Sequence, residues 1–183
     1  DSSELCVIKN DLMANVDSDK DSRSDWEKTY REGLEQLGMK YEERTQPFEG
    51  ASGVMHPLLA ESVTQFQAQA YNELLPSQGP VKTQVLGMTT AESEQQASRV
   101  QEFMNYQLMQ VMKEYDSETD QMLFYLPLSG SAFRKVYYDQ NLDRAVSKFI
   151  PSEDLIVPYS ATDLHSATRI THVIDMSLND IKK

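Results

Sequence analysis

The sequence has one cysteine, a shortage of basic residues and no long apolar run. Cys6 alone cannot form an internal disulfide or a multi-cysteine zinc site, and this favours an intracellular, reducing origin. No stretch approaches the ~20 apolar residues that a membrane-spanning helix needs. The first residues also lack the basic-then-apolar pattern of a signal peptide. These absences exclude a disulfide-rich secreted scaffold and an integral membrane segment.

The shortage of basic residues gives the chain a formal charge of −12, from 17 basic and 29 acidic residues among 183. Proteins that bind nucleic acids obtain much of their affinity from Lys and Arg side chains that neutralise phosphates. We therefore expect this surface to repel DNA on average. The 39% hydrophobic content is enough for one domain, or for one domain and part of another.

No metal or other cofactor site is predicted. His56, His165 and His172 share no metal-ligand spacing such as HExxH. The stretch VDSDKDSRSD has acids at alternate positions, as in a calcium loop. An EF-hand would need glycine and glutamate where Ser22 and Lys28 stand, so the calcium interpretation fails.

Helical signals dominate the first two thirds of the chain. Ser24 and Glu27 have the spacing of a capping box at the start of a short helix that Gly38 ends. A second helix is predicted to follow Pro57 and to end at Pro76.

Two further helices are predicted after a turn and a short extended piece at 81–86. Thr90 is expected to open the longest helix, whose apolar residues recur at intervals of three and four. The last helix is expected to be capped by Asp116 or Ser117, to break near Pro127 and to close at Gly130.

The character of the sequence changes after Gly130. Four short runs are rich in β-branched and aromatic residues, namely SAFRKVYYD, RAVSKFIP, DLIVPYS and RITHVIDM. DQNLDR is a hairpin-sized turn between the first two. We predict an α+β fold with several helices, one of them long, followed by a small, mainly antiparallel sheet.

Three parts are expected along the chain. Residues 1–23 are a flexible acidic segment, 24–130 a mainly helical part, and 131–183 a β-rich part. The chain begins without methionine, and a helix capped by Ser177 has barely begun at its end. We therefore expect a fragment of a longer protein.

The stretch PFEGASGVMHP, residues 47–57, matches no catalytic loop. Gly50 and Gly53 are too close for a phosphate-binding P-loop, and neither its lysine nor a GxSxG elbow is present. Backbone N–H groups there could bind an anion. A bent connector into the following helix is the interpretation that we favour.

A metal-dependent hydrolase or nuclease is the enzymatic alternative, with Asp154, Asp163 and His165 in loops beside predicted strands. Lys148 lies near Glu153, but the PD…ExK order of nucleases is absent. We assign no catalytic residue.

Three long stretches follow one another between Pro47 and Met176, with PFEGASGVMHPLLAESVTQFQAQAYNELLPSQGPVKTQVLG first, then MNYQLMQVMKEYDSETDQMLFYLPLSGSAFRKVYYD, then FIPSEDLIVPYSATDLHSATRITHVIDM. Together they resemble the N-terminal part of portal proteins, the head-to-tail connectors of tailed bacteriophages. The resemblance implies a wing-like α+β region without catalytic residues. It also implies a homo-oligomeric ring, typically a dodecamer, at one vertex of the capsid.

The resemblance further implies a structural role in the virion, with assembly in the cytoplasm of the bacterial host. Viral double-stranded DNA would pass through the ring during packaging and ejection, and terminase, capsid and head–tail adaptor proteins would dock on it. An acidic wall would let DNA slide without retaining it. A virion adaptor protein that is not a portal remains an alternative.

Two helix faces are the predicted packing or oligomer faces, because their apolar residues recur at helical spacing. They are Trp26, Tyr30 and Leu34 on the first helix, and Val100, Met104, Leu108 and Val111 on the longest one.

Overall fold

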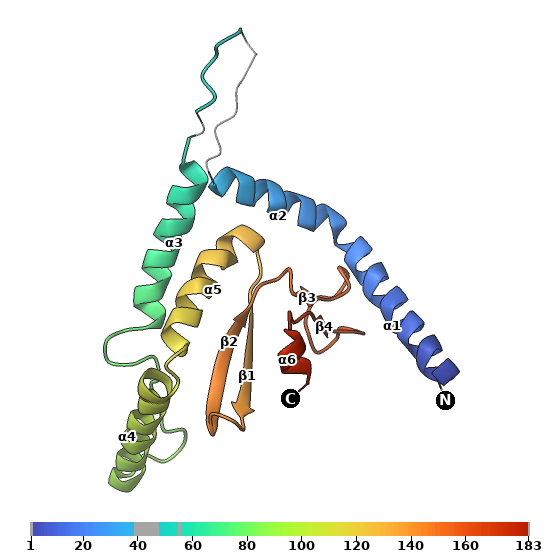
Figure 1. Ribbon diagram of the computed structural model, residues 1–183. Helices are drawn as coiled ribbons and strands as arrows, with labels where there is room; N and C mark the ends of the chain where they lie inside the picture. Colours follow the sequence, from blue (N-terminus) through green and yellow to red (C-terminus); the bar gives the residue numbers. More distant parts are fainter. Residues whose placement is uncertain (1, 39–47, 55, 183) are drawn as a thin grey trace. The chain divides into compact units, whose positions relative to one another are not determined.

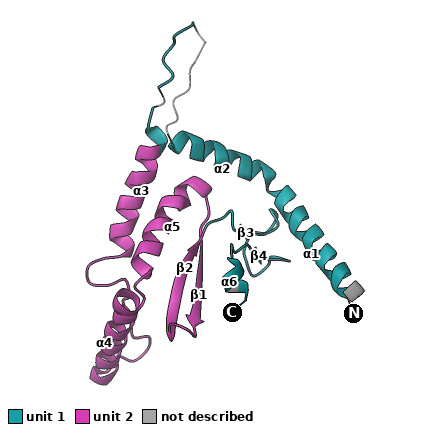
Figure 2. Ribbon diagram, viewed as in Figure 1, with its two compact units in different colours: residues 1–59, 151–183 teal, residues 60–150 magenta. Residues whose placement is uncertain are grey.

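The structure is a computed structural model that describes residues 2–38, 48–54 and 56–182 (Figure 1). The chain forms two compact units, unit 1 from residues 1–59 and 151–183 and unit 2 from residues 60–150 (Figure 2). Helices precede two small antiparallel two-stranded sheets, and this confirms the predicted α+β class. The boundaries of these units, after residues 59 and 150, differ from the boundaries of the three parts expected from sequence.

Unit 1 joins the two ends of the sequence. Its elements are α1 (Ser2–Ser22), α2 (Ser24–Leu37), β3 (Leu155–Ile156), β4 (Thr171–His172) and α6 (Leu178–Ile181). In the small sheet Leu155 lies opposite His172, and the backbone N–H of Val173 donates to the carbonyl of Asp154 at 2.8 Å. Leu155 and Ile156 are buried, so this short strand is the apolar anchor of the C-terminal segment.

The N-terminal segment is a helix of 21 residues, where the sequence led us to expect a flexible segment. It contains neither glycine nor proline, and Glu4 in its first turn and Lys20 in its last complement the helix dipole. Its side chains are nearly all exposed. The Asp and Ser content of the segment predicted flexibility, but the absence of helix breakers allows a regular helix.

The start of α2 differs from the predicted capping box, and its end agrees with the prediction. Ser24 is the first helical residue, Arg23 is the N-cap, and no side chain caps the helix there. The carboxylate of Glu27 instead accepts a hydrogen bond from Arg23 Nε at 2.8 Å. Gly38 is the C-cap, and its N–H donates to the carbonyl of Leu34.

Unit 2 holds nearly all of α3 (Leu58–Leu74), then α4 (Ala91–Tyr106), the π-helical η1 (Gln107–Val111), α5 (Tyr115–Ser129), β1 (Phe133–Asp139) and β2 (Arg144–Ile150). As predicted, α3 ends before Pro76. Thr90 opens α4 as expected, because its Oγ1 accepts from the N–H of Ser93 while Ser93 Oγ accepts from the N–H of Thr90. The prediction that this helix is the longest was wrong, since α4 has 16 residues and α1 has 21. The stretch 81–86 forms no strand.

Helix α5 departs from two predictions. It starts at Tyr115, so Asp116 and Ser117 lie in its first turn and neither is its cap. It also continues through Pro127 to Ser129. Proline removes one N–H so close to the helix end that little of the hydrogen-bond ladder is lost. Gly130 then ends the helix with a φ of 76°, as the sequence predicts.

The predicted hairpin of β1 and β2 is confirmed. Asp139 lies opposite Arg144 at its closed end, and Asp139 Oδ1 accepts from the N–H groups of Asn141 and Leu142. Asp143 adopts a φ of 52°, which Asp tolerates in turns.

The connector in PFEGASGVMHP contains a turn, since the N–H of Ala51 donates to the carbonyl of Phe48 and Gly50 has a φ of 85°. Pro47 and Met55 lie outside the described residues, as does most of the extended stretch expected before them. No helix in the described part of the chain has both the length and the apolar character to cross a membrane.

Candidate functional site

The residues of the hydrolase alternative do not converge. The main chain of Asp154 pairs with Val173, and the carboxylate of Asp163 accepts from the N–H of Ser166 at 2.7 Å. Hydrogen bonds from Ser166 lower the pKa of Asp163, and His165 is exposed. Across residues 2–38, 48–54 and 56–182, no three His, Cys, Asp or Glu side chains are grouped so that they could hold a metal ion. The Asp163 carboxylate thus serves a local turn, and the main chain of Asp154 extends the pairing of β3 with β4.

The junction of α1 and α2 is held in unit 1 by a buried arginine. Arg23 is only 7% exposed, and its Nη1 donates to the carbonyls of Ser152 at 2.9 Å and Leu155 at 3.0 Å. Its Nη2 donates to the carbonyl of Glu153 at 2.8 Å. One guanidinium therefore satisfies two carbonyls of the turn before β3 and one at the start of β3, and the Glu27 carboxylate balances its charge. No local pattern around Arg23 predicts this role.

A second ion pair lies one helical turn earlier. Asp19 is 3% exposed, and its carboxylate accepts two hydrogen bonds from Arg169, from Nε at 2.9 Å and from Nη2 at 2.6 Å. These bonds from Arg169 hold the pKa of Asp19 below its ordinary value, although burial acts in the opposite direction. Arg23 and Asp19 thus fasten the C-terminal segment at two points, at 152–155 and at Arg169, to the helices of unit 1.

The predicted face on α2 is partly used inside the chain. The rings of Trp26 and Tyr30 stack with centroids 5.3 Å apart, and the guanidinium of Arg23 lies 5.4 Å from the Trp26 centroid. Tyr30 is buried and Trp26 is half-buried, whereas Leu34 remains exposed. Only the C-terminal part of this face is thus open to a partner.

Helix α4 makes its contacts within unit 2 through polar side chains. Asn105 Oδ1 accepts from the N–H of Val81 at 2.9 Å, and its Nδ2 donates to the Val81 carbonyl at 3.2 Å. Gln101 Oε1 accepts from the N–H of Thr83 at 3.2 Å. The close approach requires Gly79, because a Cβ there would lie 2.4 Å from Asn105 Cγ and the backbone φ is 95°.

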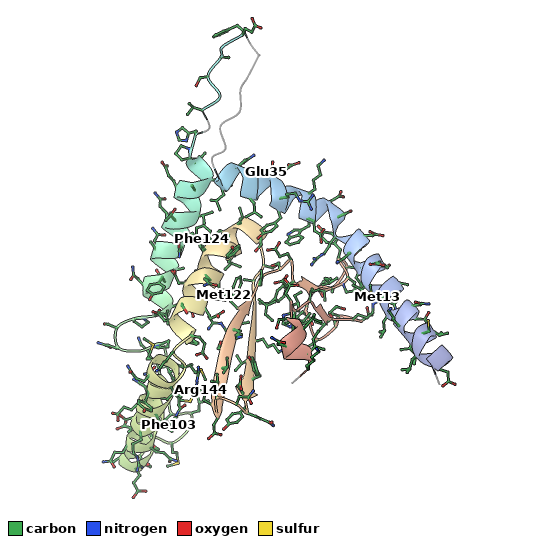
Figure 3. The ribbon with its side chains drawn as sticks, in the orientation of Figure 1. Met13, Glu35, Phe103, Met122, Phe124 and Arg144 are labelled. Atoms are coloured by element: carbon green, nitrogen blue, oxygen red, sulfur yellow. The ribbon has the colours of Figure 1, made fainter. Side chains whose placement is uncertain are left out.

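The large apolar side chains of α4 remain in solvent. Val100 and Met104 of the predicted face are exposed, and no residue of α4 is buried. Phe103, labelled in Figure 3, is 60% exposed, and Tyr106 is exposed as well. Leu108 and Val111 in η1 are half-buried. Periodicity predicted the face, but the exposure of Phe103 was not part of the prediction.

The start of α5 covers the outer edge of β2 with carboxylates. Glu118 Oε2 accepts from the N–H of Phe149 at 2.6 Å, and Glu114 Oε1 accepts from the N–H of Ser147 at 3.4 Å. Arg144, labelled in Figure 3, pairs with Glu114 at 2.8 Å and lowers the pKa of that carboxyl. No pattern in the sequence predicts this contact.

Comparison with protein-family models and with curated proteins finds no match to this chain.

Replacement of Arg23 by methionine should lower the free energy of unfolding by about 2–4 kcal/mol, because carbonyls near β3 lose their donor. Thermal and urea unfolding of the 183-residue chain measure the change. Arg31→Met in α2, at an exposed position, is the matched control and should change stability by under about 0.5 kcal/mol. Equal effects of the two substitutions would contradict the role of Arg23.

The Asp19–Arg169 pair predicts a pH dependence. Because the folded pKa of Asp19 is lowered, the pair stabilises the fold above the unfolded pKa of about 3.9, and this contribution disappears as pH falls toward the folded pKa. Asp19→Asn should therefore be less stable than the wild type at neutral pH, and the difference should shrink below about pH 4. Urea unfolding at several pH values checks this. Asp17→Asn, at an exposed site, should show no such trend, and a pH-independent difference for Asp19→Asn would refute the assignment.

Proposed function

We propose that this chain is the wing-like part of a portal protein. It would work in a ring at the capsid vertex through which viral DNA is packaged and ejected, and on which terminase and tail proteins dock. The support from sequence is the resemblance over three consecutive stretches between Pro47 and Met176. The α+β arrangement agrees with that resemblance.

The observation that carries the proposal is the exposure of the large apolar side chains of α4. A helix of this length is marginal in water unless one of its faces packs against another element. No residue of α4 is buried, yet Val100, Phe103, Met104 and Tyr106 are exposed. Exposed apolar clusters of this kind mark protein–protein contact sites. In a ring, a neighbouring subunit would cover this cluster, which we call the α4 face.

Helix α1 repeats the same pattern in unit 1. Leu5, Ile8, Leu12 and Met13 are all exposed, and Figure 3 labels Met13. Two helices in separate units thus carry apolar residues that are exposed in the described part of the chain. A protein whose role is assembly would present such faces, whereas a small-molecule enzyme would not need them.

The charge of the chain fits passage of DNA without retention. With a net charge of −12, the average surface offers few phosphate-neutralising contacts. Weak affinity would let DNA slide along a channel built from such subunits.

An adaptor protein of the virion is the second candidate, because exposed helix faces would serve it equally well. No observation favours the hydrolase, since Asp154, Asp163 and His165 do not meet. Ring formation separates the portal from the adaptor.

Electron microscopy and mass measurement of the complete product of the gene that contains this sequence test the proposal. We expect annular particles whose mass is an integral multiple of the subunit mass. Phe103→Glu should weaken ring assembly by about 10- to 100-fold, because a buried aromatic contributes roughly 1.5–3 kcal/mol.

Gln96→Glu adds the same charge at another exposed position of α4 and is the control, with ring yield unchanged. A wild-type product without rings would contradict the portal proposal. Wild-type rings with an unaffected Phe103→Glu variant would instead show that the α4 face is not the contact.

A further inference from the structure

The hairpin in unit 2 has two outer edges, and they differ. On β2, the N–H groups of Ser147 and Phe149 point away from β1 and donate to Glu114 and Glu118. Two carboxylates thus occupy the hydrogen-bond donors that another strand would use. This edge is closed by the protein itself.

The outer edge of β1 has no such cover. In an antiparallel ladder, N–H groups point alternately to the partner strand and to the outside. Ser147 lies opposite Val136 and Phe149 opposite Arg134, so the N–H groups of Arg134, Val136 and Tyr138 point outward. Within the described ranges, these three N–H groups have no hydrogen-bond acceptor.

The side chains along this edge are also accessible. Val136 is 65% exposed and Tyr138 is 60% exposed. The strand contains no proline that would block pairing. Asp139 stands at its end, and the guanidinium of Arg134 packs over the Tyr115 ring. Lys135 is therefore the remaining charged residue within the strand. The Lys135 ammonium lies 5.5 Å from the centroid of the Tyr137 ring, so an aromatic ring already accommodates that charge.

We propose that β1 pairs with β1 of a second copy of this chain, antiparallel and centred on Val136. This register overlaps all seven residues of the strand, Phe133 to Asp139. It places Arg134 opposite Tyr138 and Lys135 opposite Tyr137, so no two like charges face each other. Registers centred on Arg134 or Lys135 would set like charges against each other, which destabilises a strand pair.

Pairing would convert two hairpins into one four-stranded sheet. Two-stranded sheets are marginally stable in water, and additional strands stabilise them. The net charge of −12 on each copy opposes association, so moderate salt should favour it by screening the repulsion.

This contact is independent of the proposed ring. A two-fold contact uses the same surface on both copies and closes on itself, whereas ring neighbours meet through different surfaces. The β1 edge is also distinct from the α4 face, so Phe103→Glu should leave strand pairing unchanged.

Cysteine crosslinking of the 183-residue chain tests the register. In a Cys6→Ser background, Val136→Cys places two thiols at a hydrogen-bonded pair with a Cα–Cα distance of about 5.5 Å, within the range of a disulfide. We expect a covalent dimer under mild oxidation, formed at least about ten times faster than with Lys148→Cys, an exposed position on β2. Equal rates for the two variants would overturn the proposal.

Sedimentation equilibrium gives a second readout without cysteines. Val136→Pro removes an outward N–H and leaves the ladder to β2 intact, because proline is tolerated on the outer side of an edge strand. It should weaken dimerisation at least about tenfold, while Val136→Thr, which keeps the N–H, should not. Circular dichroism verifies that both variants fold. A wild-type chain that stays monomeric at roughly 1 mM, or dimerises no better than Val136→Pro, refutes the pairing.

Discussion

The constraint on which this structure depends is how little apolar surface the chain buries on its own. Among the described residues only nine hydrophobic side chains are buried, and they are divided between two units. Polar contacts between distant residues supply stabilisation that a larger apolar core would otherwise supply. In unit 1, Arg23 gathers three carbonyls and Asp19 holds Arg169, and in unit 2 Asn105 and Gln101 hold the segment before α4. Hydrogen bonds fix geometry well but leave the apolar faces of α1 and α4 in solvent.

Local signals in the sequence predicted the parts of the fold that local chemistry decides. The helix start at Thr90, the glycines that end α2 and α5, and the hairpin turn after Asp139 depend on neighbouring residues, and all are confirmed. The helix over residues 2–22 was missed because acidic and serine-rich composition outweighed the absence of helix breakers. Pro127 was expected to break a helix, yet near a C-terminus its missing N–H has little effect.

The long-range contacts of Arg23 and Asp19 and the covered outer edge of β2 could not be predicted in the same way. Arg23 bonds to residues about 130 positions away, and Asp19 to one 150 positions away, so neither has a local signature. For α4 the difficulty is different. Apolar residues at helical spacing give the same pattern in a core and in an interface, and only the exposure of Val100 and Phe103 separates the two. The structure thus adds to the sequence pattern the information that these residues are exposed in the described part of the chain.

We propose that a chain with a small core, a few polar contacts between distant residues and exposed apolar helix faces is completed by other subunits. Hydrogen exchange tests this claim most directly, through a comparison of the 183-residue chain alone with the same segment in the assembled product of its gene. We expect the amides of Ala91–Tyr106 to exchange at least about ten times more slowly in the assembly, because a neighbour then covers the α4 face. Unchanged exchange along this helix after assembly would contradict the account.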